Sequence, residues 1–347
     1  METTYYSGID LHKLTSHITT VRADGSLVKE ANLKNHASLI TAYFAGLPGS
    51  HQAVVESTSN WYWLADLLHE QGIDIRLAHA KYVKAIAYAK VKTDKVDAHT
   101  LAQLLRTDLI PAAHQVSPRR RAHRDILRTR LKLVHRKTMA VNATHLLCAK
   151  FNVKDILDLP PAYQLQAGCH LRQVELLDQE IKTLEEALYP ELVPDADIQR
   201  LIQIPGIGRI VAFTVMLEID TIERFESEGQ FLSYCRLVPS ARNSGGRKRQ
   251  QTSRDGNRYL KLAFSHAAVR AIQFYREIKD FYRSKKRKKP DAVARTLVAK
   301  ELARIVFYML KKQENFNGCF KGKPLSRTKA LPAVFNRSWP LRASPAA

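Results

Sequence analysis

The stretch "YYSGIDLHKLTSHITTVRADGSLVKEANL", Tyr5–Leu33, carries the pattern of three short strands. Apolar and β-branched residues predict strands over Tyr5–Leu11, His17–Arg22 and Leu27–Leu33. The sequence Ala-Asp-Gly-Ser at 23–26 supplies turn residues between the second strand and the third. The stretch therefore predicts a sheet whose first strands are joined by short connections, one of them a hairpin.

After this hairpin, strands alternate with helices. The apolar run "QAVVEST", Gln52–Thr58, and the stretch Ile73–His79 are the next predicted strands. Asn60 as the N-cap and Gly72 as the end bound one predicted helix. Further helices are predicted at Ser38–Ala45, Ala80–Tyr88 and Thr93–Leu105. The alternation predicts a mixed α/β sheet with helices on its faces.

The middle of the chain predicts a long antiparallel helical hairpin. The basic stretch Arg119–Lys137 has apolar residues at helical spacing, and a loop follows around Asp158–Pro161. The second predicted helix carries an apolar stripe at near-heptad spacing, formed by Leu171, Val174, Leu177, Ile181, Leu184 and Leu188. Such a pair is either an oligomerisation arm or an internal helical pair, and the sequence leaves both open.

The C-terminal part is predicted to be mainly helical over Ile198–Lys312, with a loop rich in Gly, Ser and Arg over Pro239–Gly256. The end, Gly318–Ala347, has six basic residues and four prolines, which predicts a poorly ordered tail. The predicted domains are an α/β domain at 1–115, a helical connector at 116–192, a mainly helical domain at 193–315 and a basic tail at 316–347.

The net charge is +22, from 55 Lys and Arg residues against 33 Asp and Glu residues. This excess favours a polyanionic partner, nucleic acid above all, over a protein whose basic charge serves only solubility. A membrane partner is not expected, because there is no apolar run of about 18 residues, no lipidation motif and no signal peptide. Four scattered cysteines argue against zinc fingers and disulfide frameworks and fit a reducing cytoplasm.

Four acidic residues stand where a sheet and a helix can bring them together. Asp10 ends the first strand, and Glu56 ends the apolar run "AVVE". Asp94 and Asp97 lie three residues apart, on one face of a predicted helix. Gathered carboxylates repel each other unless cations lie between them, and Mg²⁺ prefers such oxygen ligands. Two Mg²⁺ ions can clamp the attacking and leaving oxygens of a phosphodiester, with Mn²⁺ as an expected substitute.

These acids also have ordinary structural explanations. Asp94 follows Thr93, a good N-cap, and carboxylates in a first turn are stabilised by the helix dipole. Asp10 also suits a turn, whereas Glu56 is harder to explain at the end of a buried run. From the residues alone, helix-start acids and a metal site both remain open.

Two later segments are candidates for contact with a phosphate. The turn Pro205–Gly208 presents backbone N–H groups before a helix, as in helix-hairpin-helix proteins, or is a plain helix–helix turn. Ser244 precedes two glycines and three cations, so its hydroxyl is a candidate nucleophile in phosphoryl transfer, with a solvated basic loop as the alternative. The candidate nucleic-acid contacts are Gly206, Gly208, Arg247, Lys248, Arg249, Arg254, Asn257 and Lys261.

In their order and spacing, these motifs resemble the DEDD transposases of bacterial insertion sequences, the insertion-sequence 110 family, which includes the pilin-gene invertases. The resemblance covers most of the chain. It is carried by "GIDLHK" (Gly8–Lys13), "VVEST" (Val54–Thr58), "KTDKVDAHTLAQLL" (Lys92–Leu105), "IPGIG" (Ile204–Gly208), "YCRLVPSARNSGG" (Tyr234–Gly246), "DGNRYLKLAFSHAA" (Asp255–Ala268) and "AKELARIVFYML" (Ala299–Leu310).

The resemblance implies a RuvC-like N-terminal domain of RNase H type and a C-terminal transposase domain, on either side of the helical hairpin that the near-heptad spacing predicts as a coiled-coil connector. It implies that the Mg²⁺ ligands of the family fall on Asp10, Glu56, Asp94 and Asp97, and its nucleophilic serine on Ser244. It also implies a composite site between subunits of a dimer or tetramer, with the serine joined covalently to a DNA end. A structured guide RNA from the element would pair with donor and target DNA in the bacterial cytoplasm, at the nucleoid.

The sequence departs from the family pattern at two points. Arg254 and Asp255 stand where the family commonly has a Lys before Gly-Asn, and Ser240 competes with Ser244 as nucleophile. Three other functions remain open: a junction nuclease that uses the acids with water, an actin-like sugar kinase, and a non-catalytic binder of nucleic acid. The kinase shares the "GID" strand, but His12 stands where it has a small phosphate-loop residue.

Overall fold

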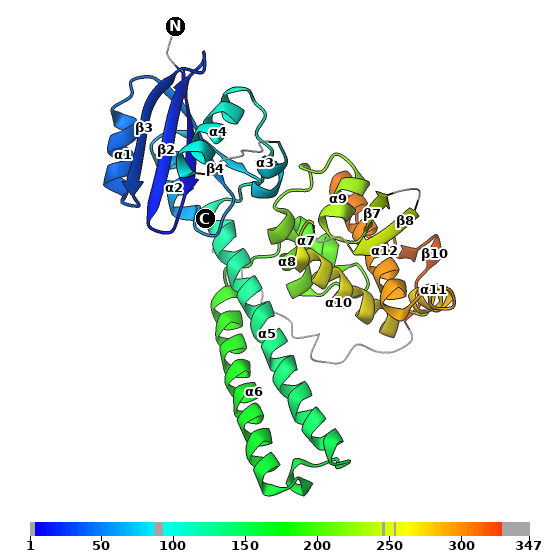
Figure 1. Cartoon of the computed structure of the whole chain (residues 1–347). Helices are drawn as coiled ribbons and strands as arrows, with labels where there is room; N and C mark the ends of the chain where they lie inside the picture. Colours follow the sequence, from blue (N-terminus) through cyan, green and yellow to red (C-terminus); the bar gives the residue numbers. More distant parts are fainter. Residues whose placement is uncertain (1–3, 87–92, 245–246, 253–254, 328–347) are drawn as a thin grey trace, which may run out of the picture. The chain divides into compact units, whose positions relative to one another are not determined.

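The computed structural model describes residues 4–86, 93–244, 247–252 and 255–327, and over 240–252 it describes the backbone alone. The chain divides into two compact units, Met1–Pro118 and Arg119–Ala347 (Figure 1), and each has its own hydrophobic core. No helix within the described ranges is long and apolar enough to cross a membrane.

The first unit is built on a six-stranded mixed sheet, in the order β3-β2-β1-β4-β5-β6. Its strands are β1 Thr4–Leu11, β2 Thr15–Arg22, β3 Leu27–Lys34, β4 Ser50–Glu56, β5 Asp74–Ala78 and β6 Ala112–Ala113. β1, β2 and β3 pair antiparallel, whereas β4 pairs parallel with both β1 and β5. The mixed α/β sheet expected from the sequence is confirmed.

Helices cover both faces of this sheet. They are α1 Ala37–Ala45, α2 Tyr62–Glu70, α3 Ala80–Ile86 and α4 Asp94–Arg106. Ile9 and Val55 are fully buried in the core that includes residues of α1 and α2, whereas Val54 belongs to a second cluster with Leu101 of α4. Because side chains alternate along a strand, the even-numbered residues of β1 and β4 face α4. This alternation decides which residues at the strand ends can reach α4.

Two details of the first unit differ from the prediction. Asn60 does not cap α2, which begins at Tyr62 after Trp61. The Asn60 side-chain amide instead donates a hydrogen bond to the His12 carbonyl oxygen at 2.8 Å. The sequence also did not predict β6, because two alanines after Pro111 carry no strand pattern.

Two long helices begin the second unit and lie side by side (Figure 1). They are α5 Pro118–Lys150 and α6 Pro161–Leu188, joined through the short 3-10 helix Ile156–Asp158. Arg130 of α5 donates to Glu185 of α6 at 2.6 Å. Further along α5, Lys137 donates to Asp178, also at 2.6 Å, so the two helices run antiparallel. The helical pair is present, and its role as a coiled-coil oligomerisation arm stays a prediction.

The rest of the second unit is mainly helical, as the sequence predicts. Its helices are α7 Ala196–Ile202, α8 Arg209–Ile219, α9 Glu228–Tyr234, α10 Arg258–Phe274, α11 Arg276–Lys286 and α12 Asp291–Lys312. Every residue of α8 from Ala212 to Ile219 is buried. A helix that is apolar on nearly all sides lies at the centre of a core, and Phe264 of α10 and Leu302 of α12 are fully buried in the same cluster.

Between α9 and α10 the chain forms a β-hairpin, where the sequence predicted a loop. β7 (Pro239–Ser244) pairs antiparallel with β8 (Arg247–Thr252), and Ser244 lies opposite Arg247. Apart from Pro239 and Ala241, these twelve positions hold only polar and basic residues. A prediction based on the periodicity of apolar residues therefore could not detect these strands.

The first part of the segment predicted as a poorly ordered tail is structured. β9 (Cys319–Phe320) pairs with β10 (Lys323–Pro324), and both lie in the segment expected to be poorly ordered. The Phe320 ring is 2% exposed and packs edge-on against Phe281 of α11. Burial of this aromatic ring fixes the segment on the helical domain. Residues 328–347 of the predicted tail lie outside the described residues.

Candidate active site

The sheet brings the ends of β1 and β4 to one edge. These strands are parallel neighbours, and their last paired residues are Ile9 and Val55. The next residues are Asp10 and Glu56, both half-buried. Since side chains alternate along each strand, both carboxylates leave the sheet on the face toward α4. The register of the sheet thus places the first two predicted site residues next to each other.

α4 lies close to this end of β1 because β1 has a glycine there. A Cβ atom on Gly8 would stand 2.1 Å from the Ala98 carbonyl oxygen of α4. The turn of α4 that precedes Ala98 carries Asp94 and Asp97. The close approach of helix and strand therefore brings the second pair of acids to the end of β1, beside Asp10.

Local helix chemistry also favours acids at this point. The Thr93 hydroxyl accepts a hydrogen bond from Val96 N at 3.2 Å, so the predicted N-cap is confirmed. Asp94 and Asp97 lie in the first turn, near the positive end of the helix dipole. The two explanations that the sequence left open are compatible, because the same dipole stabilises the carboxylates at the sheet edge.

His12 joins this cluster, although the sequence-based site did not include it. Its Nε2 lies 3.1 Å from Asp10 Oδ2 and 3.2 Å from Asp94 Oδ1. The ligand atoms of these three residues all lie within 4.8 Å of one another, close enough to surround one cation. The sequence does contain a signal for His12: it stands two positions after Asp10 in "GIDLHK", and residues i and i+2 of an extended chain point to the same face.

Negative charge is crowded around Asp10. Burial raises the pKa of the Asp10 carboxyl above its usual value, and the Asp94 and Asp97 carboxylates raise it further, whereas His12 opposes the rise. The negative charge of Asp10 in turn raises the pKa of His12. A cation among these groups relieves the repulsion. Oxygen ligands at a partly exposed edge fit a hard divalent ion that keeps several water ligands, which is the coordination that Mg²⁺ prefers.

Two asparagines hold the backbone after β1. The His12 carbonyl oxygen accepts from Asn35 Nδ2 at 2.9 Å and from Asn60 Nδ2 at 2.8 Å. Each amide is itself oriented, since Ser16 donates to Asn35 Oδ1 at 2.6 Å and Thr58 donates to Asn60 Oδ1 at 3.0 Å. The sequence did not reveal the contacts of the two asparagines with His12, because they join residues far apart in the chain.

The predicted nucleophile belongs to the second unit. Ser244 is the last residue of β7 and pairs with Arg247, and the intervening Gly245 and Gly246 lie outside the described residues. Its competitor Ser240 stands four residues earlier on the same strand. The structure describes only the backbone of Ser244, Arg247, Lys248 and Arg249, and Arg254 lies outside the described residues.

The chain that returns from this hairpin is anchored by Asn257, the N-cap of α10. Its Oδ1 accepts from Tyr259 N at 2.8 Å and from Leu260 N at 3.1 Å. Its Nδ2 donates to Glu218 Oε2 at 2.6 Å. Asn257 is 8% exposed, and both ends of its amide are bound within the protein. Asn257 therefore serves the fold rather than the predicted contact with nucleic acid.

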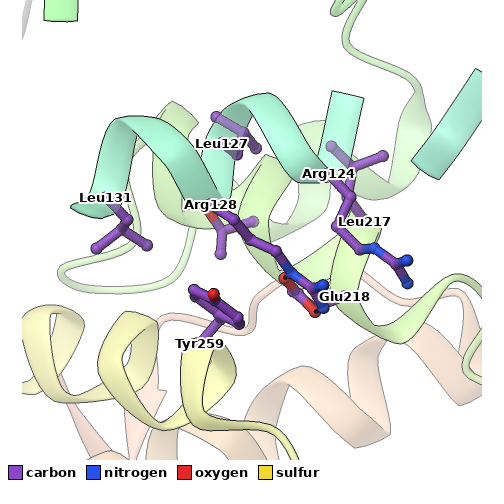
Figure 2. Close-up of a pocket in the computed structure, with 8 residues that line it drawn as sticks. Arg124, Leu127, Arg128, Leu131, Leu217, Glu218 and Tyr259 are labelled. Atoms are coloured by element: carbon purple, nitrogen blue, oxygen red, sulfur yellow. Dashed lines mark hydrogen bonds and ion pairs between the residues drawn. The ribbon is translucent and has the colours of Figure 1, made fainter. Parts of the chain in front are cut away.

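Glu218 connects this anchor to α5. Figure 2 shows the Arg128 side chain of α5 pointing at the Glu218 carboxylate, with the Tyr259 ring beside it. Arg128 Nε and Nη2 each donate to one oxygen of Glu218 at 2.6 Å, and the guanidinium carbon is 4.6 Å from the centre of the Tyr259 ring. Burial lowers the pKa of Arg128, but the hydrogen bonds and charge of Glu218 outweigh it and raise the pKa overall. One buried polar network thus joins α5, α8 and the end of the hairpin segment.

The two glycines of the Pro205–Gly208 turn have different surroundings. Gly206 has φ +81°, and a Cβ atom there would stand 2.1 Å from the Ala267 carbonyl oxygen of α10. Gly206 is therefore a packing residue. Gly208 precedes α8 as its N-cap, and a Cβ atom there would meet nothing within 4 Å. Of the two, only Gly208 leaves room for a ligand. Lys261, another candidate contact, is half-buried on α10.

Comparison with known proteins identifies the family. A model of DEDD transposases of the IS110 type matches residues 7–148, and the model "Transposase IS116/IS110/IS902 family" matches residues 198–283. A "Probable family 20 transposase" of Pseudomonas aeruginosa is 26% identical over 88% of this chain and 96% of the relative. The transposase for insertion sequence element IS1328 of Yersinia enterocolitica is also 26% identical, over 69% of this chain and 75% of the relative. The chain therefore belongs to the IS110 family of DEDD transposases and is a DNA transposase.

Proposed function

We propose that this transposase cuts and rejoins DNA strands with two sets of groups. One is the acidic cluster of a RuvC-like first unit, and the other is the Ser244 hydroxyl of the second unit. The observation that carries the proposal is the meeting of β1 and α4, where His12 lies within 3.2 Å of both Asp10 and Asp94. Crowded carboxylates of this kind are typical of sites that process phosphodiesters with metal ions.

The acidic cluster would hold divalent cations. Its members are Asp10, Glu56, Asp94 and Asp97, with His12 beside them. Bound there, Mg²⁺ would neutralise charge on the scissile phosphate and stabilise the oxygens that attack and leave. The fold of the chain holds the carboxylates that would bind the metal ions in place. β1 and β4 supply two carboxylates from a sheet, and α4 supplies two from a capped first turn.

The Ser244 hydroxyl would act as the nucleophile. Its oxygen forms a bond to phosphorus while one phosphorus–oxygen bond of the DNA strand breaks. The serine proton passes to solvent, and the leaving deoxyribose oxygen takes up a proton and ends as a hydroxyl. Rejoining is the reverse exchange, in which a strand hydroxyl attacks the phosphoserine and releases the serine. One phosphate ester replaces another, so strand exchange needs no external energy source.

Further proposals concern the partners. A structured RNA from the element would guide the protein, so that base pairing supplies the sequence specificity and the protein supplies the chemistry. The net charge of +22 supports a complex with nucleic acid. A dimer or tetramer would act on the nucleoid in the bacterial cytoplasm, with the acids and the serine of each reacting site drawn from different subunits.

The test compares Ser244→Ala, Ser240→Ala and Asp10→Asn in purified protein, with the non-coding RNA and the junction DNA of its own element. Covalent protein–DNA product is followed on denaturing gels. Ser240→Ala is expected to form this product and Ser244→Ala to form none. Asp10→Asn is expected to lower cleavage by on the order of 10²–10³-fold, because one charged group that stabilises the transition state is lost. Chelation should abolish cleavage, and Mn²⁺ should restore it.

Other outcomes would select other mechanisms. Cleavage that survives in Ser244→Ala but is lost in Asp10→Asn would indicate a junction nuclease that uses water. If Ser240→Ala forms no covalent product while Ser244→Ala still forms it, the nucleophile is Ser240. Unchanged DNA rearrangement by Asp10→Asn would remove the acids from the mechanism. The match to transposases gives the actin-like sugar kinase no support.

A further inference from the structure

A stripe of cations follows α11 and continues past its end. Along the helix, successive cations are three or four residues apart, so they share one face. Three more follow between the end of α11 and the start of α12. We refer to these residues as the basic stripe: Arg276, Lys279, Arg283, Lys286, Arg287, Lys288 and Lys289. No residue of the basic stripe belongs to the candidate contacts predicted from the sequence.

The opposite face of α11 is fixed on the helical domain. Ile278 is fully buried, and the Phe281 ring packs against Phe320 with 5.5 Å between ring centres. At the start of the helix, Glu277 accepts hydrogen bonds from the Ser326 backbone and hydroxyl at 2.9 Å and 2.6 Å. These contacts hold the helix in one orientation, with the basic stripe toward solvent.

Neighbouring acids neutralise only part of this charge. Asp280 lies 4.0 Å from both Arg276 and Arg283, and Asp291 lies 3.4 Å from Lys286. In the part of the chain that the structure describes, four cations of the stripe have no carboxylate within ion-pair distance: Lys279, Arg287, Lys288 and Lys289. A run of cations without counter-charges on a fixed helix attracts a polyanion.

We infer that the basic stripe binds the phosphodiester backbone of a nucleic acid. From Arg276 to Arg287 the helix rises about 16 Å, which is the axial rise of about five nucleotides of one strand. Lys and Arg side chains contact phosphates and fix the position of a duplex.

This surface adds a binding site to the proposed function and does not depend on it. Binding through the basic stripe requires neither Ser244 nor the acidic cluster. Equilibrium binding measured in the presence of a chelator therefore tests the stripe even if the proposed cleavage chemistry is wrong.

The test neutralises the four cations that have no ion pair, by Lys279→Gln, Arg287→Gln, Lys288→Gln and Lys289→Gln in the full chain. Fluorescence anisotropy measures binding to a duplex DNA and to a hairpin RNA, each of about 20 base pairs and arbitrary sequence, over a range of salt concentrations. The dissociation constant is expected to rise at least about tenfold at low salt, and the slope of log affinity against log salt to fall by about 0.9 for each DNA phosphate lost.

Two control proteins separate an effect of the basic stripe from an effect of total charge or of the substitutions themselves. The first removes four exposed cations of the helical hairpin, by Lys132→Gln, Arg136→Gln, Lys154→Gln and Arg172→Gln, and so has the same net charge as the test protein. The second keeps the charge of the stripe, by Lys279→Arg, Arg287→Lys, Lys288→Arg and Lys289→Arg. Circular dichroism verifies that all three proteins are folded.

The outcomes assign or overturn the site. Weaker binding of DNA, of RNA or of both by the test protein alone, with wild-type binding by both control proteins, supports the inference and identifies the backbone that is bound. Equal weakening in the net-charge control would show that total charge, rather than this surface, governs binding. That result, or unchanged binding of both probes by the test protein, would overturn the inference.

Discussion

Gly8 sets the distance between the strand that carries Asp10 and the helix that carries Asp94. In Gly8→Ala, the new methyl group would stand 2.1 Å from the Ala98 carbonyl oxygen, so α4 must move away from β1. A displacement of catalytic groups by about 1 Å can lower a rate by about 10²-fold. We expect a loss of this order in strand cleavage by purified protein, with the sheet still folded.

Gly168→Ala provides the control for this substitution. Gly168 lies within α6, and a Cβ atom there would meet only the end of the Arg172 side chain, at 3.4 Å. Its cleavage rate should equal that of the unmodified protein. Full activity in Gly8→Ala would show that the close packing of α4 does not position the acids.

The glycines of the Pro205–Gly208 turn give a second prediction at this scale. Gly206→Ala combines a backbone clash with Ala267 and a left-handed φ of +81°, and should lower the free energy of unfolding by about 3 kcal/mol. Gly208→Ala should change it by less than about 1 kcal/mol, because its site is open and only the N-cap preference changes. Urea denaturation followed by circular dichroism measures both. Equal losses would mean that packing against α10 does not explain Gly206.

At the scale of elements, the ion pair between α5 and α8 is expected to stabilise the second unit. Glu218 is 2% exposed and accepts from both Arg128 and Asn257. Glu218→Ala removes the carboxylate that accepts from Arg128 Nε and Nη2 and leaves the partly buried guanidinium only Asp125, at 3.5 Å, which should cost about 3 kcal/mol. Asp178→Ala removes an exposed partner of Lys137 and should cost less than about 1 kcal/mol.

The positions of the tryptophans provide an internal control for this measurement. Two of the three tryptophans, Trp61 and Trp63, belong to the first unit, and Trp339→Phe in all the proteins compared removes the signal of the third. Most of the helices belong to the second unit. In Glu218→Ala the circular dichroism transition should move to lower urea, and the tryptophan transition of the first unit should stay in place. A Glu218→Ala protein as stable as Asp178→Ala would contradict a structural role for the network.

The sequence predicted elements well where the pattern was local. Alternation and turn residues placed β1 to β5 within about two residues of their ends, and Thr93 indicated the start of α4. Asp10 and Glu56 each stand at the end of a predicted strand, and parallel pairing of these strands brings their ends to the same edge of the sheet. The sequence therefore sufficed to predict that the two residues lie at one edge. The β7–β8 hairpin was not predicted because its residues are mostly polar and cationic. Hydrogen bonds between backbones can pair two strands without the apolar residues on which strand prediction relies.

The roles of two asparagines depend on contacts between segments that are distant in the chain, and such contacts cannot be predicted from local patterns in a single sequence. Asn60 satisfied the rule for an N-cap, yet its amide binds the His12 carbonyl oxygen across the unit. Asn257 was assigned to nucleic acid by its place in a motif, whereas the structure buries it against Glu218. In both cases tertiary hydrogen bonds decide the role of a polar residue that local rules assign elsewhere.

At the scale of the molecule, the acids and the serine belong to different compact units. Asp10 and its neighbours are part of Met1–Pro118, and Ser244 is part of Arg119–Ala347. Each unit buries its own core. In the proposed mechanism a reacting phosphate would contact one unit of each kind, and the two units could come from one chain or from two.

Mixing two inactive proteins distinguishes these arrangements. If the site joins acids of one subunit to the serine of another, an assembly of Asp10→Asn with Ser244→Ala contains an intact site, made from the unmodified half of each chain. In a random dimer, roughly a quarter of the wild-type sites would be restored, because half of the dimers are mixed and each has one intact site. Co-refolded proteins should therefore regain covalent product with DNA, whereas each protein alone should form little or none. Absence of product from the mixture, with mixed dimers verified by differently tagged chains, would show that acids and serine act within one chain.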